Sequence, residues 1–331
     1  MSAGKMDWQP LVSIITPSYN QGRFLEAALR SVLEQDYPRI EYIVIDGGSR
    51  DESAAILERY AARLAHWEST PDRGQAHAIN KGLRLARGEL LGWLNSDDEL
   101  LPGALRRAVE AFDQPPPADV VYGRLERSDV NGRAVPTPAL PKDRVVFGRE
   151  RLLGECIVNQ PGTLWRRSVM EKAGPLDETL HYALDYEFWM RLALAGARFK
   201  RLDAPQARFR LSPGSKTVAG AVAHADEALA VLEAYARRPD LPALTGLAAS
   251  QLAAQAQRTR AVFHLLAANG ELRRGAFGRA LARLGLALRS DPRALFERRW
   301  LDLARARARR SRAPVRYNEP QPEPEAEETP E

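Results

Sequence analysis

Three groups of polar residues near the start of the chain each follow a short apolar run, and their types are suited to binding a ligand. The groups are 16–20 (TPSYN), 46–49 (DGGS) and 95–98 (NSDD). In an open parallel sheet, ligands bind beyond the carboxyl ends of the strands. We therefore expect the three groups to converge on one rim.

The adjacent Asp97 and Asp98 are the candidate metal ligands. Two carboxylates behind a buried strand raise each other's pKa unless a cation lies nearby. Hard divalent ions such as Mg²⁺ and Mn²⁺ take oxygen ligands and can bridge to a diphosphate. The alternative is that both residues belong to a solvated helix cap before Leu100.

Asp46 and Asp185 are the other candidate functional carboxylates. Two glycines follow Asp46 and allow close approach of the backbone to a ligand, while its carboxylate can accept a hydrogen bond from a nucleobase N–H. The alternative is that Asp46 simply opens a turn. Asp185 begins a predicted helix, where the dipole favours the charged form that a general base needs. An ordinary first-turn aspartate is the alternative there.

An α/β fold must position these residues, because short apolar runs alternate with amphipathic stretches, a pattern typical of a parallel sheet with helices on both faces. The predicted strands are 12–16, 42–45, 89–94 and 120–122, and the predicted helices are 24–33, 53–64 and 75–86. Ser49 and Glu52 have the spacing of a capping box, which predicts that the second helix starts directly after the DGG turn.

The pattern changes after residue 122. Asn131-Gly132 predicts a hairpin within 122–135, and a proline-rich loop follows at 136–141. Helices are predicted at 166–173 and 185–195, with an apolar run at 197–202. Residues 218–236 and 247–310 are rich in Ala, Leu and Arg, predict a separate helical element, and include a stretch similar to a tetratricopeptide half-repeat at 275–292. Residues 313–331 alternate Pro and Glu and predict disorder.

Composition excludes several classes of protein. Of 331 residues, 44% are apolar and 27% charged, which is typical of a globular chain. The one cysteine, Cys156, excludes a disulfide framework or a multi-cysteine metal site. We expect a cytoplasmic protein, because the N-terminus lacks a signal-peptide pattern and no apolar run is long enough to span a membrane. The net charge of +5 comes without an aromatic-interleaved basic motif, so we expect no nucleic-acid partner.

Five segments in order resemble the family-2 glycosyltransferases of the GT-A fold, and more closely their bacterial surface-polysaccharide members. They are TPSYN, DGGSRDES, PDRGQAHAINKG, GWLNSDD and ALDYEFWMRLA, and the resemblance covers about residues 11–217. It implies a Rossmann-like, mostly parallel sheet, a nucleotide-diphosphate-sugar donor, a divalent metal (Mn²⁺ or Mg²⁺), and inversion at the anomeric carbon. The expected organisation is a GT-A domain over 1–217, an arginine-rich helical region over 218–312 and an acidic tail over 313–331.

The resemblance also implies roles for single residues. Asp46 corresponds to the carboxylate that contacts the base, usually uracil, and Asp72 to a second nucleotide-site carboxylate, with Asn80 on the helix behind it. The usual Asp-x-Asp metal motif corresponds to Asn95-Ser96-Asp97 followed by Asp98, so Asp97 and Asp98 are expected to hold the metal with support from Asn95. The expected donor-side residues are Pro17, Tyr19, Asn20, Asp46, Asp72, Lys81 and Asp97.

On the acceptor side, Asp185 is expected to deprotonate the acceptor hydroxyl. The other acceptor-side candidates are Gln160 and Thr163 as a wall of the site, Glu187 as a substitute base, and Trp189, which either packs in the core or stacks on a sugar ring. Relatives commonly carry a histidine just before a Gly-Ser-Lys turn, where this chain has Ser212. Its contact with the diphosphate would then fall to Arg210 or Lys216.

The sequence thus predicts an inverting, metal-assisted glycosyltransferase of hexosyltransferase type, acting on a glycan or lipid-linked acceptor. A nucleotide-sugar pyrophosphorylase is one alternative, but TPSYNQG has no lysine and one glycine where a basic, glycine-rich phosphate loop is needed. A non-catalytic nucleotide-sugar-binding scaffold is another. Residues 237–312 hold 17 arginines against 5 acids, which predicts either a solvated helical face or reversible contact with the inner face of a membrane.

Overall fold

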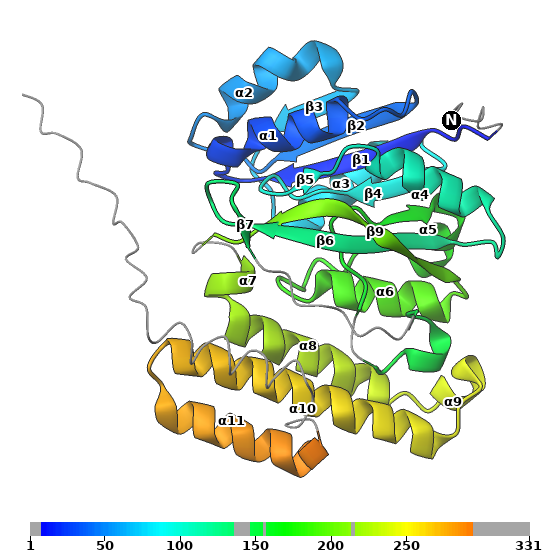
Figure 1. The fold of residues 1–331 in the computed structure, drawn as a ribbon, viewed down its shortest axis with the longest axis vertical. Coiled ribbons are helices and arrows are strands. Elements are labelled where there is room, and N and C mark those ends of the chain that lie inside the picture. The colour runs from blue at the N-terminus through cyan, green and yellow to red at the C-terminus, as the bar shows by residue number, and fades with distance from the viewer. Residues whose placement is uncertain (1–7, 136–145, 155–156, 213–215, 294–331) are drawn as a thin grey trace, which may run out of the picture.

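One sheet of nine strands, with helices on both faces, organises the computed structural model, which describes residues 8–135, 146–154, 157–212 and 216–293 (Figure 1). The strand order is β3-β2-β1-β4-β8-β6-β9-β5, with β7 paired to β6. The predicted α/β class is confirmed. The strands are β1 (Val12–Ser18), β2 (Ile40–Asp46), β3 (His66–Ser69), β4 (Leu90–Trp93), β5 (Glu99–Leu100), β6 (Val120–Ser128), β7 (Ala134–Val135), β8 (Leu164–Arg166) and β9 (Phe199–Arg210).

Most of the helices lie close to the stretches predicted from apolar spacing, but the helix over Ala104–Asp113 was not predicted, and the helical stretch predicted over 247–310 is interrupted after Arg273. They are α1 (Gly22–Leu33), α2 (Ser53–Tyr60), α3 (Gln75–Leu85), α4 (Ala104–Asp113), α5 (Arg167–Ala173), α6 (Leu184–Leu194), α7 (Lys216–Ala219), α8 (Ala221–Ala236), α9 (Leu241–Thr245), α10 (Ala249–Arg273) and α11 (Phe277–Ser290), with 3-10 turns η1 (Ala61–Arg63) and η2 (Arg149–Arg151). Within the described residues, no helix combines the length and the apolar character needed to cross a membrane.

Four neighbouring strands, β3, β2, β1 and β4, run parallel. Their register places Ser18 opposite Asp46 and Asp46 opposite Ser69, while Ile15 lies opposite Trp93. The carboxyl ends of these strands therefore meet along one edge. As predicted, the polar groups that follow β1, β2 and β4 leave the sheet on the same rim.

Beyond β4 the sheet is mixed. Strand β8 is antiparallel to both β4 and β6, whereas β9 is parallel to β6 and antiparallel to β5. The predicted parallel arrangement thus describes the half of the sheet up to β4. Sequence alternation does not predict β3, β5 or β8, because these strands have only two to four residues and cannot display a period.

Successive residues of the central strands point to opposite faces and into two apolar cores. Ile14 packs with Leu25 and Leu29 of α1, and the same core includes residues of α2 and α4. Ile15 belongs to the core on the other face, which is covered by α3, α5 and α6. Burial on both faces explains why these strands read as continuous apolar runs.

An aromatic cluster holds α6 against the sheet. Trp93 of β4 lies 5.6 Å from Trp189 of α6 in a stacked arrangement and 5.4 Å from Trp165 of β8 in an edge-on one, as measured between ring centroids. The side chain of Trp189 is fully buried. Of the two alternatives for Trp189, packing in the core is therefore correct and stacking on a sugar ring is not, because core side chains surround the ring.

The C-terminal helices continue this core. Leu232 of α8 and Phe263 of α10 belong to the same apolar cluster as Trp189, and α6 lies between the sheet and α8 (Figure 1). The described part of the helical region therefore packs on the α/β part and does not stand apart from it, while the domain boundary at residue 217 stays a prediction. The predictions for 136–141, Cys156 and 294–331 fall outside the described residues.

The predicted capping box is wrong. Helix α2 begins at Ser53, and Ser49 instead donates its hydroxyl to Asp46 Oδ1 at 2.6 Å. Asp51 instead satisfies one amide at the start of α2, because its Oδ1 accepts a hydrogen bond from the Ser53 amide at 3.0 Å. The loop after β2 is therefore not longer than predicted, since α2 starts at Ser53 as expected, but Ser49 organises the Asp46 turn and does not cap the helix.

Candidate active site

Asp97 and Asp98 lie in the loop between β4 and β5, and Asp98 is only 1% exposed. The Asp98 amide donates to the Asn95 carbonyl at 3.0 Å and closes a tight turn. Asp98 Oδ1 accepts the Arg210 amide at 3.1 Å, and Oδ2 accepts Asn95 Nδ2 at 3.4 Å. These bonds fix the carboxylate but bring no full positive charge into contact with it. The helix-cap alternative does not hold, because β5 follows directly.

Burial raises the pKa of Asp98 well above its ordinary value, and the neighbouring Asp97 raises it further. Burial also raises the pKa of Asp97. The guanidinium of Arg210 opposes both shifts, yet it is buried and already engaged. It donates Nε to the Asp97 carbonyl at 3.1 Å, pairs with Glu99, and lies 4.9 Å from the centroid of the Phe24 ring. The expectation that Arg210 reaches a diphosphate is therefore wrong.

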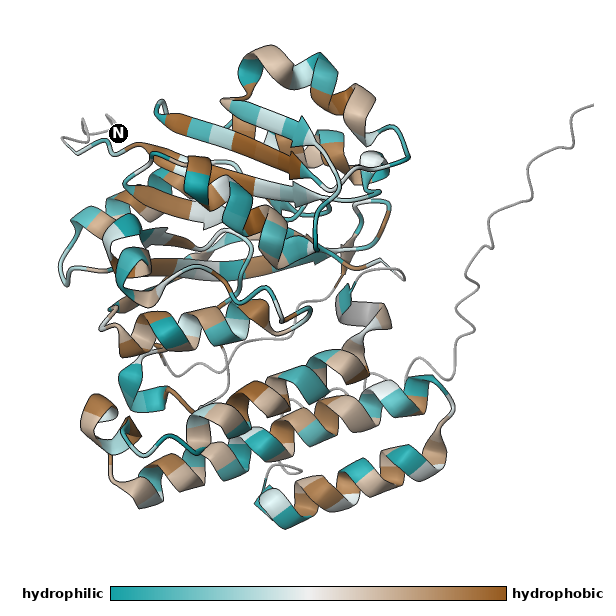
Figure 2. Cartoon of the chain, turned by 180° about the vertical axis from the view of Figure 1, so that it is seen from behind, coloured by the Kyte–Doolittle hydropathy of each residue, from teal (hydrophilic) through white to brown (hydrophobic). Residues whose placement is uncertain are grey.

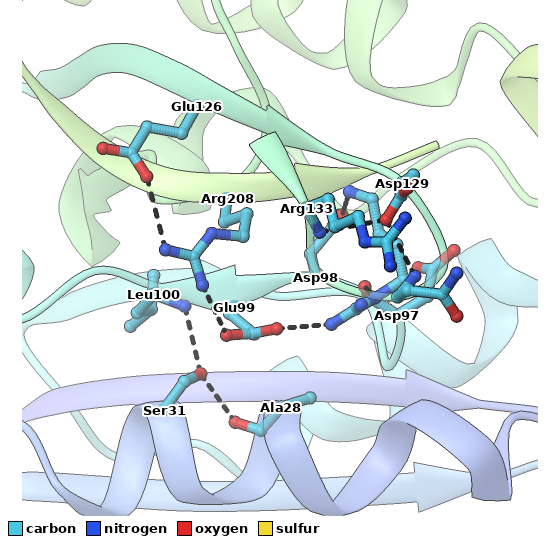
Figure 3. Close-up of polar contacts among 12 residues, drawn as sticks. Ala28, Ser31, Asp97, Asp98, Glu99, Leu100, Glu126, Asp129, Arg133 and Arg208 are labelled. Carbon is cyan, nitrogen blue, oxygen red and sulfur yellow. Dashed lines mark hydrogen bonds and ion pairs between the residues drawn. The ribbon is translucent and has the colours of Figure 1, made fainter. Parts of the chain in front are cut away.

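Contacts around Glu99 hold the strand that follows the acidic pair (Figure 3). Arg208 pairs with Glu99 at 3.2 Å and with Glu126 at 3.4 Å. The Leu100 amide donates to Ser31 Oγ at 3.0 Å, which ties β5 to α1. The two β9 arginines near the site, Arg208 and Arg210, both form ion pairs with Glu99. The carboxyl groups of Asp97 and Asp98 therefore make this part of the site electronegative.

Asn95 links the acidic pair to two amide side chains. Its Nδ2 lies 3.2 Å from Gln160 Oε1, and its Oδ1 accepts Gln75 Nε2 at 2.8 Å. Gln160 in turn donates to the Trp93 carbonyl at 2.7 Å. The predicted supporting role of Asn95 and the position of Gln160 beside the site fit this geometry. Thr163 is buried and donates inward to the Asn159 carbonyl, so it does not form the predicted wall.

The same network reaches the start of α7. Lys216 Nζ donates to Gln75 Oε1 at 2.8 Å and to the His181 carbonyl at 3.0 Å. Lys216, which the sequence offered for the diphosphate, therefore lies on the rim that joins the donor side to the segment before α6. Sequence reasoning missed Gln75, although its place at the first position of α3, directly after the PDRG turn, was a usable signal.

The loops after β1 and β2 are cross-linked. The Asn20 amide donates to Ser49 Oγ at 2.7 Å, and Asn20 Oδ1 accepts the Arg50 amide at 2.9 Å. Asn20 adopts a positive φ of 51°, which an asparagine tolerates well. Tyr19 beside it is 61% exposed. Pro17 is buried inside β1, close to the start of this loop, so its side chain has no exposed surface for a ligand to contact.

Asp46 is fully buried and organises its own turn. Its Oδ2 accepts the Ser49 amide at 2.8 Å and Ser69 Oγ at 2.7 Å. Asp46 thus stabilises the turn that it opens, as one alternative predicted. Contact of Asp46 with a nucleobase stays a prediction. Asp72 packs over Gly47, where an added Cβ would lie 2.9 Å from Asp72 Oδ2, so a side chain at position 47 would displace the Asp72 carboxylate.

Helix α3 carries the other two donor-side candidates away from this rim. Lys81 pairs with Glu68 of β3 and donates to Thr70 Oγ1 at 3.3 Å. Asn80 is buried and binds the backbone of Leu176 through both its amide atoms, at 2.9 Å each. Lys81 thus attaches α3 to β3 and to Thr70 directly after it, and Asn80 attaches α3 to the loop before α6.

Asp185 lies half-buried in the first turn of α6. Burial raises its pKa, and the charge of His224 on α8 opposes the shift. His224 comes near Asp185 only through the packing of α8 on α6, which residue spacing in the sequence does not indicate. Glu187 is bound to Arg191 Nε at 2.7 Å and to the Tyr235 hydroxyl at 2.9 Å. It is therefore a structural acid and not the substitute base.

The acidic pair fits a divalent metal. In the described part of the chain, no group of three or more His, Cys, Asp or Glu side chains could hold an ion by itself. Mg²⁺ and similar ions are, however, commonly bound by one or two carboxylates together with substrate phosphates. The adjacent carboxylates of buried Asp98 and half-buried Asp97, both with raised pKa values, supply such a half-site.

A mixed sheet of this order, with an acidic pair after its fourth strand and an aspartate at the start of α6, defines a GT-A glycosyltransferase. Comparison with known proteins agrees. The family described as glycosyl transferase family 2 matches residues 13–174. An uncharacterised glycosyltransferase of Mycobacterium tuberculosis is 35% identical over 191 residues, which cover 56% of this chain and 70% of that protein. The chain belongs to glycosyl transferase family 2, which decides against the pyrophosphorylase and scaffold alternatives.

Solved structures show the same fold. A mannosyltransferase from Pyrobaculum calidifontis, in complex with GDP-Man and Mn²⁺, has a TM-score of 0.60 at 22% identity, covering 92% of this chain and 81% of its own. The Staphylococcus aureus protein TarS, residues 1–349 in complex with UDP, has a TM-score of 0.56 at 19% identity, covering 83% of this chain and 89% of its own.

Replacing the buried Asp98 carboxylate should show how much its burial destabilises the fold. We expect Asp98→Asn to raise the melting temperature of the metal-free protein and to abolish the further rise on adding Mn²⁺. A carboxyl with a raised pKa stabilises the fold only while protonated, so its contribution is lost as pH rises. The gain from the substitution should therefore be largest at high pH and shrink as the pH is lowered, because the wild-type carboxyl then takes up a proton. Thermal unfolding in EDTA and in Mn²⁺ measures both effects.

The exposed Asp203 provides the control, because Asp203→Asn should change neither the melting temperature nor the response to Mn²⁺. An Mn²⁺-induced rise that persists in Asp98→Asn would contradict the metal assignment.

Proposed function

We propose that this protein transfers a sugar from a nucleotide-diphosphate donor, of the UDP-linked class, to a glycan or lipid-linked acceptor with inversion at the anomeric carbon. One observation carries the proposal. A continuous path of hydrogen bonds runs from Asp98 through Asn95 and Gln75 to Lys216, and from there to His181, four residues before Asp185. Donor-side acids and a general base on one connected rim are what a single displacement requires.

The donor side is supported by the cross-linked loops after β1 and β2. Exposed Tyr19 provides an aromatic face for a base, and Asp46 and Asp72 provide carboxylates next to the same loop. The resemblance to family members that bind uracil favours UDP. TarS was solved with UDP, whereas the archaeal mannosyltransferase was solved with GDP-Man, so the nucleotide must be measured.

Asp97 and Asp98 would hold a divalent metal, which when bound neutralises charge on a diphosphate leaving group. Their burial supports this role, because a low-dielectric site strengthens their attraction for a cation. Lys216 on the rim supplies a further positive charge on the same side.

Asp185 is the proposed base. The acceptor hydroxyl gives its proton to an Asp185 carboxylate oxygen while the acceptor oxygen bonds to the anomeric carbon. The bond from that carbon to the diphosphate oxygen breaks, and the nucleoside diphosphate leaves with the electron pair. Burial of Asp185 supports this role, because a raised pKa makes a carboxylate a better proton acceptor.

A screen for the donor tests the proposal. We expect one UDP-sugar, among UDP-, GDP- and dTDP-sugars, to release nucleoside diphosphate fastest in the presence of Mn²⁺, and EDTA to stop the release. NMR of the product should show the anomeric configuration opposite to that of the donor. Retention of configuration would contradict the single displacement, and equal turnover in EDTA would contradict the metal.

Loss of the base should affect turnover more than donor binding. We expect Asp185→Asn to lower kcat by about 10²-fold or more while the donor KM stays nearly unchanged. Asp177→Asn, in the exposed loop before α6, is the matched control and should keep normal kcat. Near-normal turnover by Asp185→Asn would remove this residue from the reaction.

The helical region offers a second surface. Helix α11 lies at the edge of the molecule away from the sheet and carries Phe277, Leu281 and Leu288, which are 72%, 70% and 44% exposed (Figure 2). Exposed arginines lie near this face, among them Arg273, Arg274 and Arg289. Several other arginines are neutralised by acids of the same helices, for example Arg260 by Glu233 and Arg283 by Asp226, which reduces the basic excess predicted from the sequence.

Apolar side chains beside arginines favour an anionic lipid surface. We therefore assign the GT-A domain to residues 1–217 and a reversible contact with the cytoplasmic face of a membrane to residues 218–312. Such a contact would keep the enzyme near a lipid-linked acceptor.

Vesicle flotation tests the membrane contact. We expect binding to phosphatidylglycerol vesicles at low salt, loss of binding as the salt concentration rises, and little binding to neutral phosphatidylcholine vesicles. Phe277→Ser combined with Leu281→Ser should weaken binding, whereas Leu85→Ser, at an exposed leucine of α3, should not. Absence of enrichment on anionic vesicles at low salt would leave α11 without a lipid role.

A further inference from the structure

Helix α6, which carries Asp185, has no cap of its own. Its N-cap residue is Ala183, whose side chain contains no oxygen to accept a hydrogen bond. The first amides of any helix lack partners within the helix, and the preceding backbone must also be satisfied where it is buried. Within the first turn, the Tyr186 amide donates to Asp185 Oδ1 at 2.8 Å. The amides of residues 181–183, which precede that turn, need an acceptor from elsewhere in the fold.

Glu227 of α8 supplies it. Its Oε1 accepts the His181 amide at 2.9 Å, and its Oε2 accepts the amides of Tyr182 and Ala183 at 2.6 Å each. One carboxylate, 44 residues beyond Ala183, thus binds three consecutive amides at the start of α6. A negative charge at this end of a helix is also favoured by the helix dipole.

The junction between α7 and α8 packs closely on the same segment. A Cβ added at Gly220 would lie 2.3 Å from Tyr182 Cε1, so the chain passes directly over the Tyr182 ring. Lys216 Nζ binds the His181 carbonyl at 3.0 Å. On α8, His224 lies three residues before Glu227, which places both side chains on one face of the helix, toward α6. The charged groups around the start of α6 are therefore Lys216, His224 and Glu227.

We propose that Glu227 is the positioning residue for Asp185: by holding residues 181–183 it fixes the first turn of α6 and with it the Asp185 carboxylate relative to the acceptor hydroxyl. The inference rests on the proposed role of Asp185 as the base. It assigns to the C-terminal helices a part in the transfer step itself, because the residue that orients the base lies on α8.

A double-mutant cycle tests this. Using the donor that wild-type protein turns over fastest, we expect Glu227→Ala to lower kcat by about 10-fold to 100-fold with little change in donor KM, because small displacements of a reacting group cost rates of this size. In the Asp185→Asn background the same change should alter kcat by less than about 2-fold, since a residue that acts through another has no further effect once that residue is lost. Glu227→Gln keeps one acceptor oxygen, which can still accept the amides of Tyr182 and Ala183, and should lower kcat less than Glu227→Ala does.

Glu233→Ala is the matched control. It lies on α8 and removes an ion pair with Arg260 at 2.6 Å, but it does not contact the start of α6. Equal loss of kcat in Glu227→Ala and Glu233→Ala would overturn the proposal, as would an undiminished effect of Glu227→Ala in the Asp185→Asn background. A fully active Asp185→Asn protein would instead overturn the base assignment, so the two failures can be told apart.

Discussion

Burial of a carboxylate pair is the constraint on which the rest of the site depends. Asp98 is almost removed from water beside Asp97, and burial together with their mutual repulsion raises the pKa of Asp98. Neutral groups hydrogen-bond to the Asp98 carboxylate, namely the Asn95 side chain and the Arg210 amide. The guanidinium of Arg210 pairs with Glu99, so it is not dedicated to Asp98. The fold thus holds an electronegative point at the end of β4 that a cation beside a diphosphate would stabilise.

The side chains that restrain this pair also connect the two halves of the site. Asn95 and Gln75 carry the hydrogen-bond path from the acidic pair to Lys216 and the segment before α6. The family match ends at residue 174, before α6 begins. The proposed base and the helices behind it lie C-terminal to the matched residues.

The sequence predicts the donor rim well, for a simple geometric reason. Parallel strands end at a common edge, so polar residues after Ser18, Asp46 and Trp93 had to meet. It does not predict which carboxylate stays free, because Asp46 and Glu187 are occupied by partners that only the fold brings near them. The exposure of aromatic rings shows the same limit: Trp93 and Trp165 of the sheet pack against Trp189 and bury it, whereas a loop exposes Tyr19. The residue that accepts the amides before α6, Glu227, lies on α8, and no motif near α6 in the sequence predicts it.

The most direct measurement of the central claim is a crystal structure with UDP and Mn²⁺, using anomalous scattering at the manganese edge. The account predicts one strong anomalous peak next to the carboxylates of Asp97 and Asp98, with the diphosphate on its other side and the uracil against the loops of Tyr19 and Asp46. A manganese peak away from Asp97 and Asp98, or UDP bound on another face of the sheet, would contradict it.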